Sequence, residues 1–464
     1  MVVQKFGGTS VADPPAIRRL IEIVRTTRAR DGRGPAVVVS AMSKVTDALL
    51  AIASLAGEAS VEAALTRVGE LRARHQAAAA ELAPSDRLAL SAFIDDICDQ
   101  LAALVRALAV VREVSPRTLD AIAAMGELLS SRVVAAALAD AGIPSTWVDA
   151  RHAVVTTAEH TKATPLATET RVALRSTVLA AIEQGLVPVI GGFVGASTAG
   201  HTTTLGRGGG DYSGAIVAAG IDAREIQIWT DVDGMLTADP RVVGAPVLVP
   251  ALSYAEAAEL AYFGAKVLHP STILPAVERD IPVRILNARK PEGPGTLITA
   301  AGATDGPPLT GLACKRGVTV IDVTSSRMLN SYGFLREVFE VFERYTTAVD
   351  VVTTSEVSVS VTIDDERHLA AIAAALGGIG EVSIEREMAL VCAVGDRLRN
   401  EPEIAARAVS VLEEVPLRMI SQAASRRNIT VVLRQVDLQH AMERLHAVFF
   451  EGALFERVLT GGAR

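Results

Sequence analysis

The chain has 464 residues, 50% of them hydrophobic and 21% charged, and its formal net charge at pH 7 is −8. This length is too great for one hydrophobic core, so we expect two or three domains. The acidic balance, with no block of Lys and Arg, argues against nucleic acid or a membrane as the main partner. A small ligand is expected instead, and local basic pockets for an anion remain allowed.

Composition also indicates a fold class and a compartment. The apolar residues are mostly Ala, Val and Leu, and aromatic residues make up only 4%, which favours helices packed on parallel strands. Cys98, Cys314 and Cys392 lie far apart without a C-x-x-C pair, so neither a disulfide framework nor a zinc cluster is predicted. The first residues lack the pattern of a signal peptide, and no run of about 18 apolar residues follows. We therefore expect a soluble, cytoplasmic α/β protein.

The first strand is predicted at 2–6, and it runs into Gly7 and Gly8 before a helix at 14–31. Lys5 then lies at the carboxyl end of a strand, where open α/β sheets bind ligands, beside a turn whose N–H groups suit phosphate. Alternatively, Lys5 is an ordinary solvated loop residue. The lysine precedes the glycines, so this is not a Walker P-loop.

The next strand, 36–40, is followed by polar residues, and the stretch 48–114 has the composition of an inserted helical hairpin. A further helix opens at Pro116 and ends near Gly142. It contains Glu127 beside a glycine in an apolar stretch. Both a buried carboxylate facing a pocket and a solvated helix face are consistent with this pattern.

A glycine run at 208–210 follows the strand predicted at 187–194 and precedes a helix at 212–219. Adjacent glycines can turn backbone N–H groups toward an anion, while Arg207 and Asp211 place opposite charges at the two edges. The alternative, a flexible linker, is disfavoured because linkers are not usually built into a strand, loop, helix unit. Alternating strands and helices over nearly three hundred residues predict a parallel-rich central sheet with helices on both faces.

After a stretch dense in Pro and Gly, the order changes to βαββαβ, and this order begins a second time. The second copy lacks its last strand, and we expect the orphan strand 309–314 to complete it, so that the first copy is inserted into the second. The predicted domains are 1–300, a linker with the orphan strand at 301–316, and two ferredoxin-like units at 317–387 and 388–464.

Seven motifs occur along the chain in a fixed order. They are Lys5–Ser10, Val39–Ala41 with Thr46, Met125–Glu127, Gly206–Asp211, Thr230–Gly234, Asp239–Arg241 and Phe263–Pro270. This ordered set resembles the aspartate kinases, which have an amino-acid kinase fold followed by two ACT domains. The Met328–Leu335 stretch, with Val349-Asp350 and Thr354–Glu356, is most similar to the monofunctional, lysine-sensitive type.

The resemblance implies a role for each matching residue. ATP, with Mg²⁺ held mainly by the nucleotide and no metal site on the protein, is the implied cofactor, and L-aspartate is the implied acceptor. Lys5 and Asp211 are the implied catalytic residues, with Asp211 holding lysines in place. The implied aspartate-binding residues are Ser40, Thr46, Glu127, Arg207, Gly208, Gly209 and Gly210. The implied ATP-binding residues are Lys5, Phe6, Gly7, Gly8, Thr9, Thr230, Asp231, Leu236, Arg241, Lys266 and Val267. The implied effector residues are Met328, Ser331, Gly333, Phe334, Leu335, Val349, Asp350, Ser355 and Glu356.

Two positions depart from the family pattern. Gly210 stands where the family usually has a serine, and Leu236 stands where it usually has a tyrosine, so two side-chain contacts to the substrates are missing.

The implied activity is phosphorylation of aspartate to 4-phospho-L-aspartate, at the start of lysine, threonine and methionine synthesis, with lysine as inhibitor. A homodimer through the first ACT copy is expected, and a tetramer is left open.

Two alternatives remain at this point. One is a kinase for a related acceptor such as glutamate, acetylglutamate or carbamate, although the resemblance implies that these lack the C-terminal pair and the Met-Gly-Glu helix. The other is an amino-acid-sensing protein whose kinase domain has lost activity, with Gly210 and Leu236 as the first signs of that loss.

Overall fold

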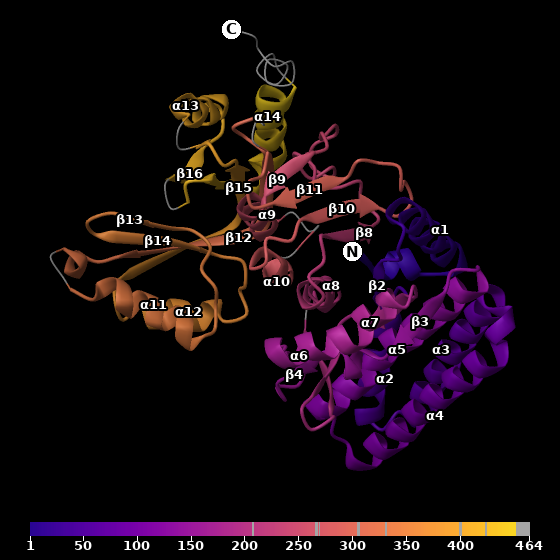
Figure 1. Ribbon diagram of the computed structural model, residues 1–464. Helices are drawn as coiled ribbons and strands as arrows, with labels where there is room; N and C mark the ends of the chain where they lie inside the picture. Colours follow the sequence, from indigo (N-terminus) through magenta and orange to yellow (C-terminus); the bar gives the residue numbers. More distant parts are fainter. Residues whose placement is uncertain are drawn as a thin grey trace, which may run out of the picture. The chain divides into compact units, whose positions relative to one another are not determined.

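The computed structural model (Figure 1) describes residues 1–206, 208–264, 268, 270–303, 307–329, 332–398, 401–422 and 425–451. Two compact units divide the chain. The first comprises Met1–Met235 with Leu268–Gly302, and the second comprises Leu236–Val267 with Ala303–Arg464. These units do not coincide with the boundary expected at residue 300, because 236–267 group with the C-terminal part. The domain boundaries stay a prediction.

The sheet of the first unit is built from short apolar strands. In three of them, β1, β2 and β5, every residue is buried, as expected of parallel strands covered on both faces. Within this unit the strand order is β3-β5-β2-β1-β8-β10-β11, and all neighbours are parallel except β10 and β11. The strands are β1 (Val2–Phe6), β2 (Ala36–Val39), β3 (Ser145–Val148), β5 (Val187–Gly191), β8 (Glu225–Thr230), β10 (Val283–Asn287) and β11 (Thr296–Thr299).

Helices accompany this sheet, and their ends follow local signals. Asp13 caps α1 by accepting a hydrogen bond from the Ala16 N–H at 2.8 Å, and Gly32 ends it with φ 68°. The α-helices are α1 (Pro14–Asp31), α2 (Val45–Gly57), α3 (Val61–Leu82), α4 (Arg87–Val111), α5 (Pro116–Asp140), α6 (Ala167–Leu174), α7 (Ala180–Glu183), α8 (Gly209–Gly220) and α10 (Leu274–Val277), and short helical turns include the 3₁₀ turn Gly8–Val11 and the π turn Arg175–Leu179.

Two predictions about this unit were wrong in detail. The stretch 48–114 is not a hairpin but three helices, α2, α3 and α4, which pack with α5 (Figure 1). The strand expected at 187–194 is two strands, because Phe193 takes φ 64° and turns the chain into a small second sheet. That sheet contains β4 (Val155–Thr156), β6 (Val194–Ser197) and β7 (Thr202–Thr204).

Helix α5 is long and apolar enough to cross a membrane by length and composition alone. However, 89% of its apolar window is buried inside the structure. This burial is typical of the central helix of a globular core, and α5 accordingly contributes many residues to an extended apolar cluster of the first unit.

The second unit contains one antiparallel sheet with the order β13-β14-β12-β15-β17-β16. Separate apolar clusters lie in its two halves, one including α11 and α12 and the other including α13 and α14. The elements are β9 (Ala251–Ser253), α9 (Tyr254–Tyr262), β12 (Gly311–Thr324), α11 (Phe334–Arg344), β13 (Val352–Thr354), β14 (Ser358–Ile363), α12 (Leu369–Leu376), β15 (Glu381–Val394), α13 (Pro402–Val411), β16 (Leu417–Gln422), β17 (Asn428–Arg434) and α14 (Leu438–Phe450).

The sequence predicted separate short strands and two sheets here, whereas β12 and β15 each run for 14 residues through both repeats. Residues 311–314, expected to complete the sheet of the second repeat, pair with 391–394 of β15. Where the sequence predicted a break between two short strands, β12 and β15 each contain only a local irregularity. The register shifts near Val318, and Glu387 has φ 55°. A strand can absorb such a bulge without ending.

Candidate active site

A cleft of about 570 Å³ lies in the first unit. The carboxyl ends of β1 and β8 and the residues after β2 and β5 contribute to it, as expected for an open parallel sheet. Its walls come from segments that are far apart in the sequence. They are Lys5, Gly7, Gly8, Thr9, Ser40, Ala41, Met42, Ser43, Lys44, Thr46, Asp47, Glu127, Phe193, Gly206, Gly208, Gly209, Gly210, Asp211 and Thr230.

Lys5 and Asp211 form an ion pair in this cleft. The Lys5 Nζ lies 2.7 Å from Asp211 Oδ1, and the two side chains are only 10% and 20% exposed. Helix α8, which carries Asp211, comes close to β1 because Gly214 has no side chain. A Cβ atom at Gly214 would lie 3.2 Å from Lys5 Cβ. The cation is thus held at the end of its strand by a fixed carboxylate, and Lys5 is not a freely solvated loop residue.

Glu127 is a buried carboxyl group in the same cleft. Its residue is 4% exposed, and its Oε1 accepts a hydrogen bond from the Ala41 N–H at 3.2 Å. Among the described residues its Oε2 has no hydrogen-bond partner. Burial raises the pKa of this carboxyl to about 8. An unpartnered buried carboxyl oxygen in a cleft suits a ligand ammonium group, which resolves the choice between a buried group and a solvated helix face.

The glycine run is packed rather than flexible. Gly208 has φ 73° and α8 starts directly after it, so the chain turns sharply here. A Cβ atom at Gly209 would lie 2.5 Å from Phe193 Cδ2, and one at Gly210 would lie 2.8 Å from Ser40 Oγ. The absence of side chains therefore lets this loop approach two other walls of the cleft.

The remaining residues implied for aspartate and ATP lie in different places. Thr46 and Thr230 line the cleft. The Phe6 side chain is fully buried and stacked on Trp229, and Asp231 is exposed beside Thr230. Leu236 and Arg241 belong to the second unit, where Arg241 pairs with Asp239 at 2.6 Å. Arg207, Lys266 and Val267 lie outside the described residues. The nucleotide roles of this group stay predictions.

Sequence reasoning missed several walls of the cleft. Lys44 lines it, with φ 66° at the start of α2, and adds a second positive charge to the described part of the site. Phe193 is also a wall, next to Gly209. The polar run after the strand at 36–40 was the available signal, but nothing in it distinguishes Lys44 from an ordinary loop lysine.

The described residues implied for an effector lie before and at the start of α11, just before β13, and in the turn between β13 and β14. Gly333 has φ 89° and precedes α11, Phe334 is buried in the core of the first repeat, and Leu335 is 41% exposed. Ser355 and Ser358 form a hydroxyl–hydroxyl contact of 2.7 Å at a turn. Met328, Val349 and Glu356 are described as well, whereas Ser331 lies outside the described residues.

Asp350, another implied effector residue, already has a cation beside it. Its carboxylate, 4% exposed, accepts hydrogen bonds from Lys315 Nζ at 3.0 Å and from the Tyr262 hydroxyl at 2.9 Å. Lys315 Nζ also contacts Asp364 at 2.9 Å. This part of the second unit therefore binds a primary ammonium group, supplied here by the chain itself.

Among the described residues, no group of three or more His, Cys, Asp or Glu side chains could hold a metal ion. That Mg²⁺ accompanies the nucleotide stays an expectation.

Comparison with known proteins adds to this geometry. Residues 1–287 match the amino acid kinase family, and residues 391–449 match an ACT domain. Over 470 residues the chain is 35% identical to aspartokinase 3, chloroplastic, of Arabidopsis thaliana, with 98% of this chain and 83% of the relative covered. The chain belongs to the aspartokinase family. It is therefore an enzyme of the kinase class, and the expected fold, a parallel-rich kinase sheet followed by an ACT region, is confirmed.

Relatives with a similar length agree. The lysine-sensitive aspartokinase 3 of Escherichia coli is 35% identical, covering 97% of this chain and 99% of the relative. The structure of E. coli aspartokinase III in complex with lysine and aspartate has a TM-score of 0.81 at 34% identity, with 97% and 99% of the two chains covered. A second E. coli structure, in complex with aspartate and ADP, has a TM-score of 0.80 with 97% and 100% covered.

Proposed function

We propose that the chain transfers the γ-phosphoryl group of ATP to the side-chain carboxylate of L-aspartate. The product, 4-phospho-L-aspartate, would enter lysine, threonine and methionine synthesis. The observation that carries this proposal is the cleft itself, which combines a nearly buried Lys5–Asp211 ion pair with a buried, half-partnered Glu127. One group suits a phosphoryl oxygen and the other suits the ammonium of an amino acid.

The chemistry needs positioning more than acid–base catalysis. A carboxylate is already a nucleophile, so the protein has to align it with the phosphoryl group and offset negative charge as the bond to the leaving oxygen breaks. Lys5 supplies a fixed positive charge for this purpose. Asp211 holds Lys5 in place and, being paired with it, is not free to act as a strong base. Mg²⁺, carried by ATP, would add charge neutralisation at the phosphates.

Glu127 would orient the acceptor. Without substrate its carboxyl group has a pKa of about 8. A bound ammonium would favour the ionised form and form a charge-assisted hydrogen bond to Oε2. Arg207, implied by resemblance to bind a carboxylate, would define the other end of the substrate. Gly210 and Ser40 line the same cleft as Glu127.

A direct assay tests the proposal. Pure protein with Mg-ATP and aspartate should give an acyl phosphate that hydroxylamine traps, and glutamate should give far less. Product with glutamate but not aspartate would favour a related acceptor. No product with either would favour the sensor alternative, in which the chain binds amino acids without turnover. The intact Lys5–Asp211 pair argues against that alternative.

We also propose that lysine inhibits the enzyme by binding at the first ACT repeat, and that this repeat forms a homodimer. Supporting this, the E. coli relative is described in complex with lysine, and Asp350 already pairs with a lysine side chain in this molecule. Exposed apolar side chains, Leu335, Phe339, Val352 and Val357, lie on α11 and near the end strand β13, which suits pairing between chains. A tetramer is left open, and a cytoplasmic location is expected.

A further inference from the structure

A buried carboxylate on helix α5 has no place in the chemistry described above. Asp120 is 1% exposed and lies seven residues before Glu127 on the same helix. Two helical turns span 7.2 residues, so the two acidic side chains lie on nearly the same face of α5. A buried carboxylate is costly unless several donors surround it, and the donors of Asp120 come from two distant segments.

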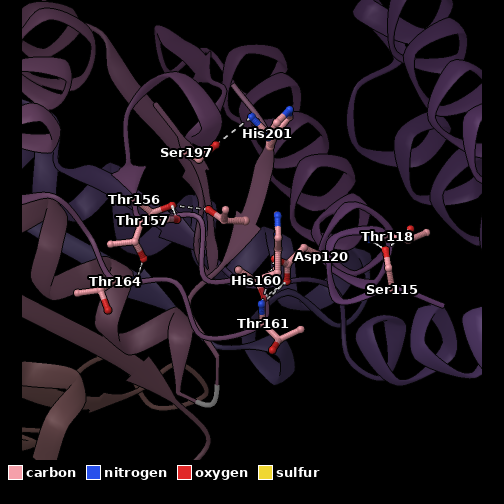
Figure 2. Close-up of polar contacts among 12 residues, drawn as sticks. Ser115, Thr118, Asp120, Thr156, Thr157, His160, Thr161, Thr164, Ser197 and His201 are labelled. Carbon is pink, nitrogen blue, oxygen red and sulfur yellow. Dashed lines mark hydrogen bonds and ion pairs between the residues drawn. The ribbon is translucent and has the colours of Figure 1, made fainter. Parts of the chain in front are cut away.

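The first of these segments is the loop at 157–164. Asp120 accepts the Thr161 N–H at 3.0 Å to both carboxylate oxygens, and His160 Nδ1 lies 2.7 Å from Oδ2. Figure 2 shows both residues facing Asp120. Thr161 has φ 69°, which is strained for a β-branched residue and persists only where its surroundings hold it. The hydrogen bonds from the Thr161 N–H to Asp120 contribute to holding this conformation.

The second segment is strand β7, which leads into the glycine loop. The Thr204 hydroxyl donates to Asp120 Oδ1 at 2.5 Å, and Thr204 is 3% exposed. The Thr204 carbonyl in turn accepts from the Ala163 N–H at 2.9 Å, which ties the strand to the first segment. Asp120 therefore anchors the strand two residues before Gly206.

The first segment also supports the glycine loop directly. Gly206 has φ 75°, and a Cβ atom on it would lie 3.1 Å from the Thr161 carbonyl oxygen. The Gly206 carbonyl accepts from the Gly209 N–H at 3.1 Å, so the backbone supported by Thr161 continues into the start of α8. These contacts connect Asp120 to both sides of the loop entrance.

We propose that Asp120 is a positioning residue for the amino-acid substrate, because it fixes Thr204 and Gly206, and through Gly206 the start of α8 at Gly209, relative to Glu127. One helix then sets both the group that faces the substrate ammonium and the loop that faces its carboxylates. Asp120 itself does not line the cleft. This inference rests on the proposed function, in which that loop binds the acceptor.

The test is the Asp120→Asn variant, which keeps the size of the side chain. It replaces one of the two acceptor oxygens by an NH₂ group, which then faces the donors from Thr161 and Thr204. Losing charge-assisted hydrogen bonds that hold the loop should raise KM for aspartate by roughly tenfold to a hundredfold. KM for ATP should stay within about twofold, because Lys5 and its turn are not touched. Isothermal titration of aspartate without ATP should show the same loss of affinity.

Ser115→Ala is the matched control. Ser115 caps the same helix by accepting from the Thr118 N–H at 3.2 Å, and Figure 2 shows it away from the Asp120 cluster. This variant should lower Tm without changing KM for aspartate. If Asp120→Asn lowers Tm in the same way and also leaves KM for aspartate unchanged, Asp120 is merely structural and the inference is wrong. The inference is also wrong if Asp120→Asn raises KM for aspartate and KM for ATP by the same factor.

A second variant guards against misfolding. Thr204→Val removes only one hydroxyl donor and should raise KM for aspartate by roughly threefold to tenfold. If Asp120→Asn does not fold, an unchanged KM in Thr204→Val overturns the inference. The wild-type assay separates the two claims. Absence of product from wild-type enzyme would refute the proposed function and this inference with it, whereas active wild type with unaltered variants refutes the inference alone.

Discussion

The ion pair between Lys5 and Asp211 gives each residue a separate task. With side chains 10% and 20% exposed, the pair is largely shielded from water, so its electrostatic effect on a nearby phosphoryl group is stronger than at a surface. Lys5 provides charge to the reacting group, and Asp211 keeps that charge in position.

Lys5→Met should therefore lower kcat by about a thousandfold or more, because the lysine charge acts mainly on the transition state. It should also lower stability by about 1–3 kcal/mol, since Asp211 is left without its cation. Steady-state kinetics and urea unfolding measure the two effects. The double variant Lys5→Met with Asp211→Asn should recover stability but not turnover. Turnover near wild type in the single variant would remove Lys5 from the site.

Glu127 couples substrate binding to pH. Its folded-state pKa of about 8 lies above the ordinary value of 4.5. Between these two values the folded state holds a proton that the unfolded state releases. The stabilisation of the folded state by the protonated Glu127 is therefore complete below about pH 4.5 and is lost as pH rises toward 8. An ammonium ligand needs the ionised form, so KM for aspartate should fall as pH rises from 6 to 8.

Glu127→Gln tests both effects. In the absence of substrate the variant should become more stable than wild type between pH 5 and 8, by an amount on the order of a few kcal/mol at pH 8. Its KM for aspartate should be high and independent of pH in that range. Thermal unfolding and initial rates at several pH values give the answer. If stability depends on pH in the same way in both proteins, the pKa of Glu127 is not raised by folding. If KM for aspartate depends on pH in the same way in both, Glu127 does not contact the substrate ammonium.

Gly210 departs from the family pattern, and the structure refines what its replacement should do. From the sequence, a serine here should lower KM for aspartate by restoring a hydroxyl. However, a Cβ atom at this position would lie 2.8 Å from Ser40 Oγ and 3.3 Å from Lys5 Cε, so Ser40 must rotate.

Gly210→Ala should accordingly raise KM for aspartate by about threefold to tenfold, since it adds the crowding without the hydroxyl. Gly210→Ser should have a lower KM than Gly210→Ala. Initial rates over a range of aspartate concentrations compare the three proteins. Identical values for the alanine and serine variants would show that a hydroxyl at 210 does not reach the substrate.

At the scale of elements, the long strands β12 and β15 join the two ACT repeats into one sheet. Leu312, near the start of β12, is 2% exposed and packs in the apolar cluster of α13 and α14, not in that of α11 and α12. A residue that precedes the first repeat in sequence thus belongs to the core of the second.

Leu312→Ala should destabilise the protein by about 2–5 kcal/mol through loss of buried apolar contacts. Urea unfolding measures this, with Val436→Ala as control because Val436 is 79% exposed. Hydrogen exchange should become faster in β17 and α14 than in β14. Faster exchange confined to β14 would show that Leu312 belongs to the core of α11 and α12 instead, which would contradict this prediction.

The elements also show what the sequence could and could not predict. Uninterrupted apolar runs such as Val2–Phe6 and Ala36–Val39 identify buried strands, and Pro and Gly identify the ends of α1 and α5. Composition alone does not count helices, so the breaks after Gly57 and at Pro84 were not recognised as separating three helices. Nor does it show that a charged stretch continues a strand, as it does at the centre of β15.

The site divides in the same way. Motif residues such as Lys5 and Glu127 could be named from the sequence because they stand beside glycines at strand ends or in apolar helices. Asp120 could not, since a single Asp on a helix is ordinary until its partners from residues 160, 161 and 204 are known. Contacts made by distant segments leave no local pattern.

At the scale of the whole molecule, regulation requires lysine to bind two states of the enzyme unequally. In the part of the chain that the structure describes, β13 is an end strand of the sheet of the second unit, and exposed apolar side chains lie nearby. Val352→Lys should weaken association through this edge and, if the dimer forms the effector site, reduce inhibition by lysine. Light scattering and lysine titration measure the two outcomes, with Val436→Lys as control. An unchanged dimer with unchanged inhibition would place the interface elsewhere.

The central claim is that this cleft phosphorylates aspartate. The most direct measurement is formation of the hydroxamate from purified protein, Mg-ATP and hydroxylamine, with aspartate and glutamate compared in parallel and Lys5→Met as the inactive control. The account predicts product with aspartate, little with glutamate, and a loss of about a thousandfold or more in the variant. No product with aspartate, or equal product from Lys5→Met, would contradict it.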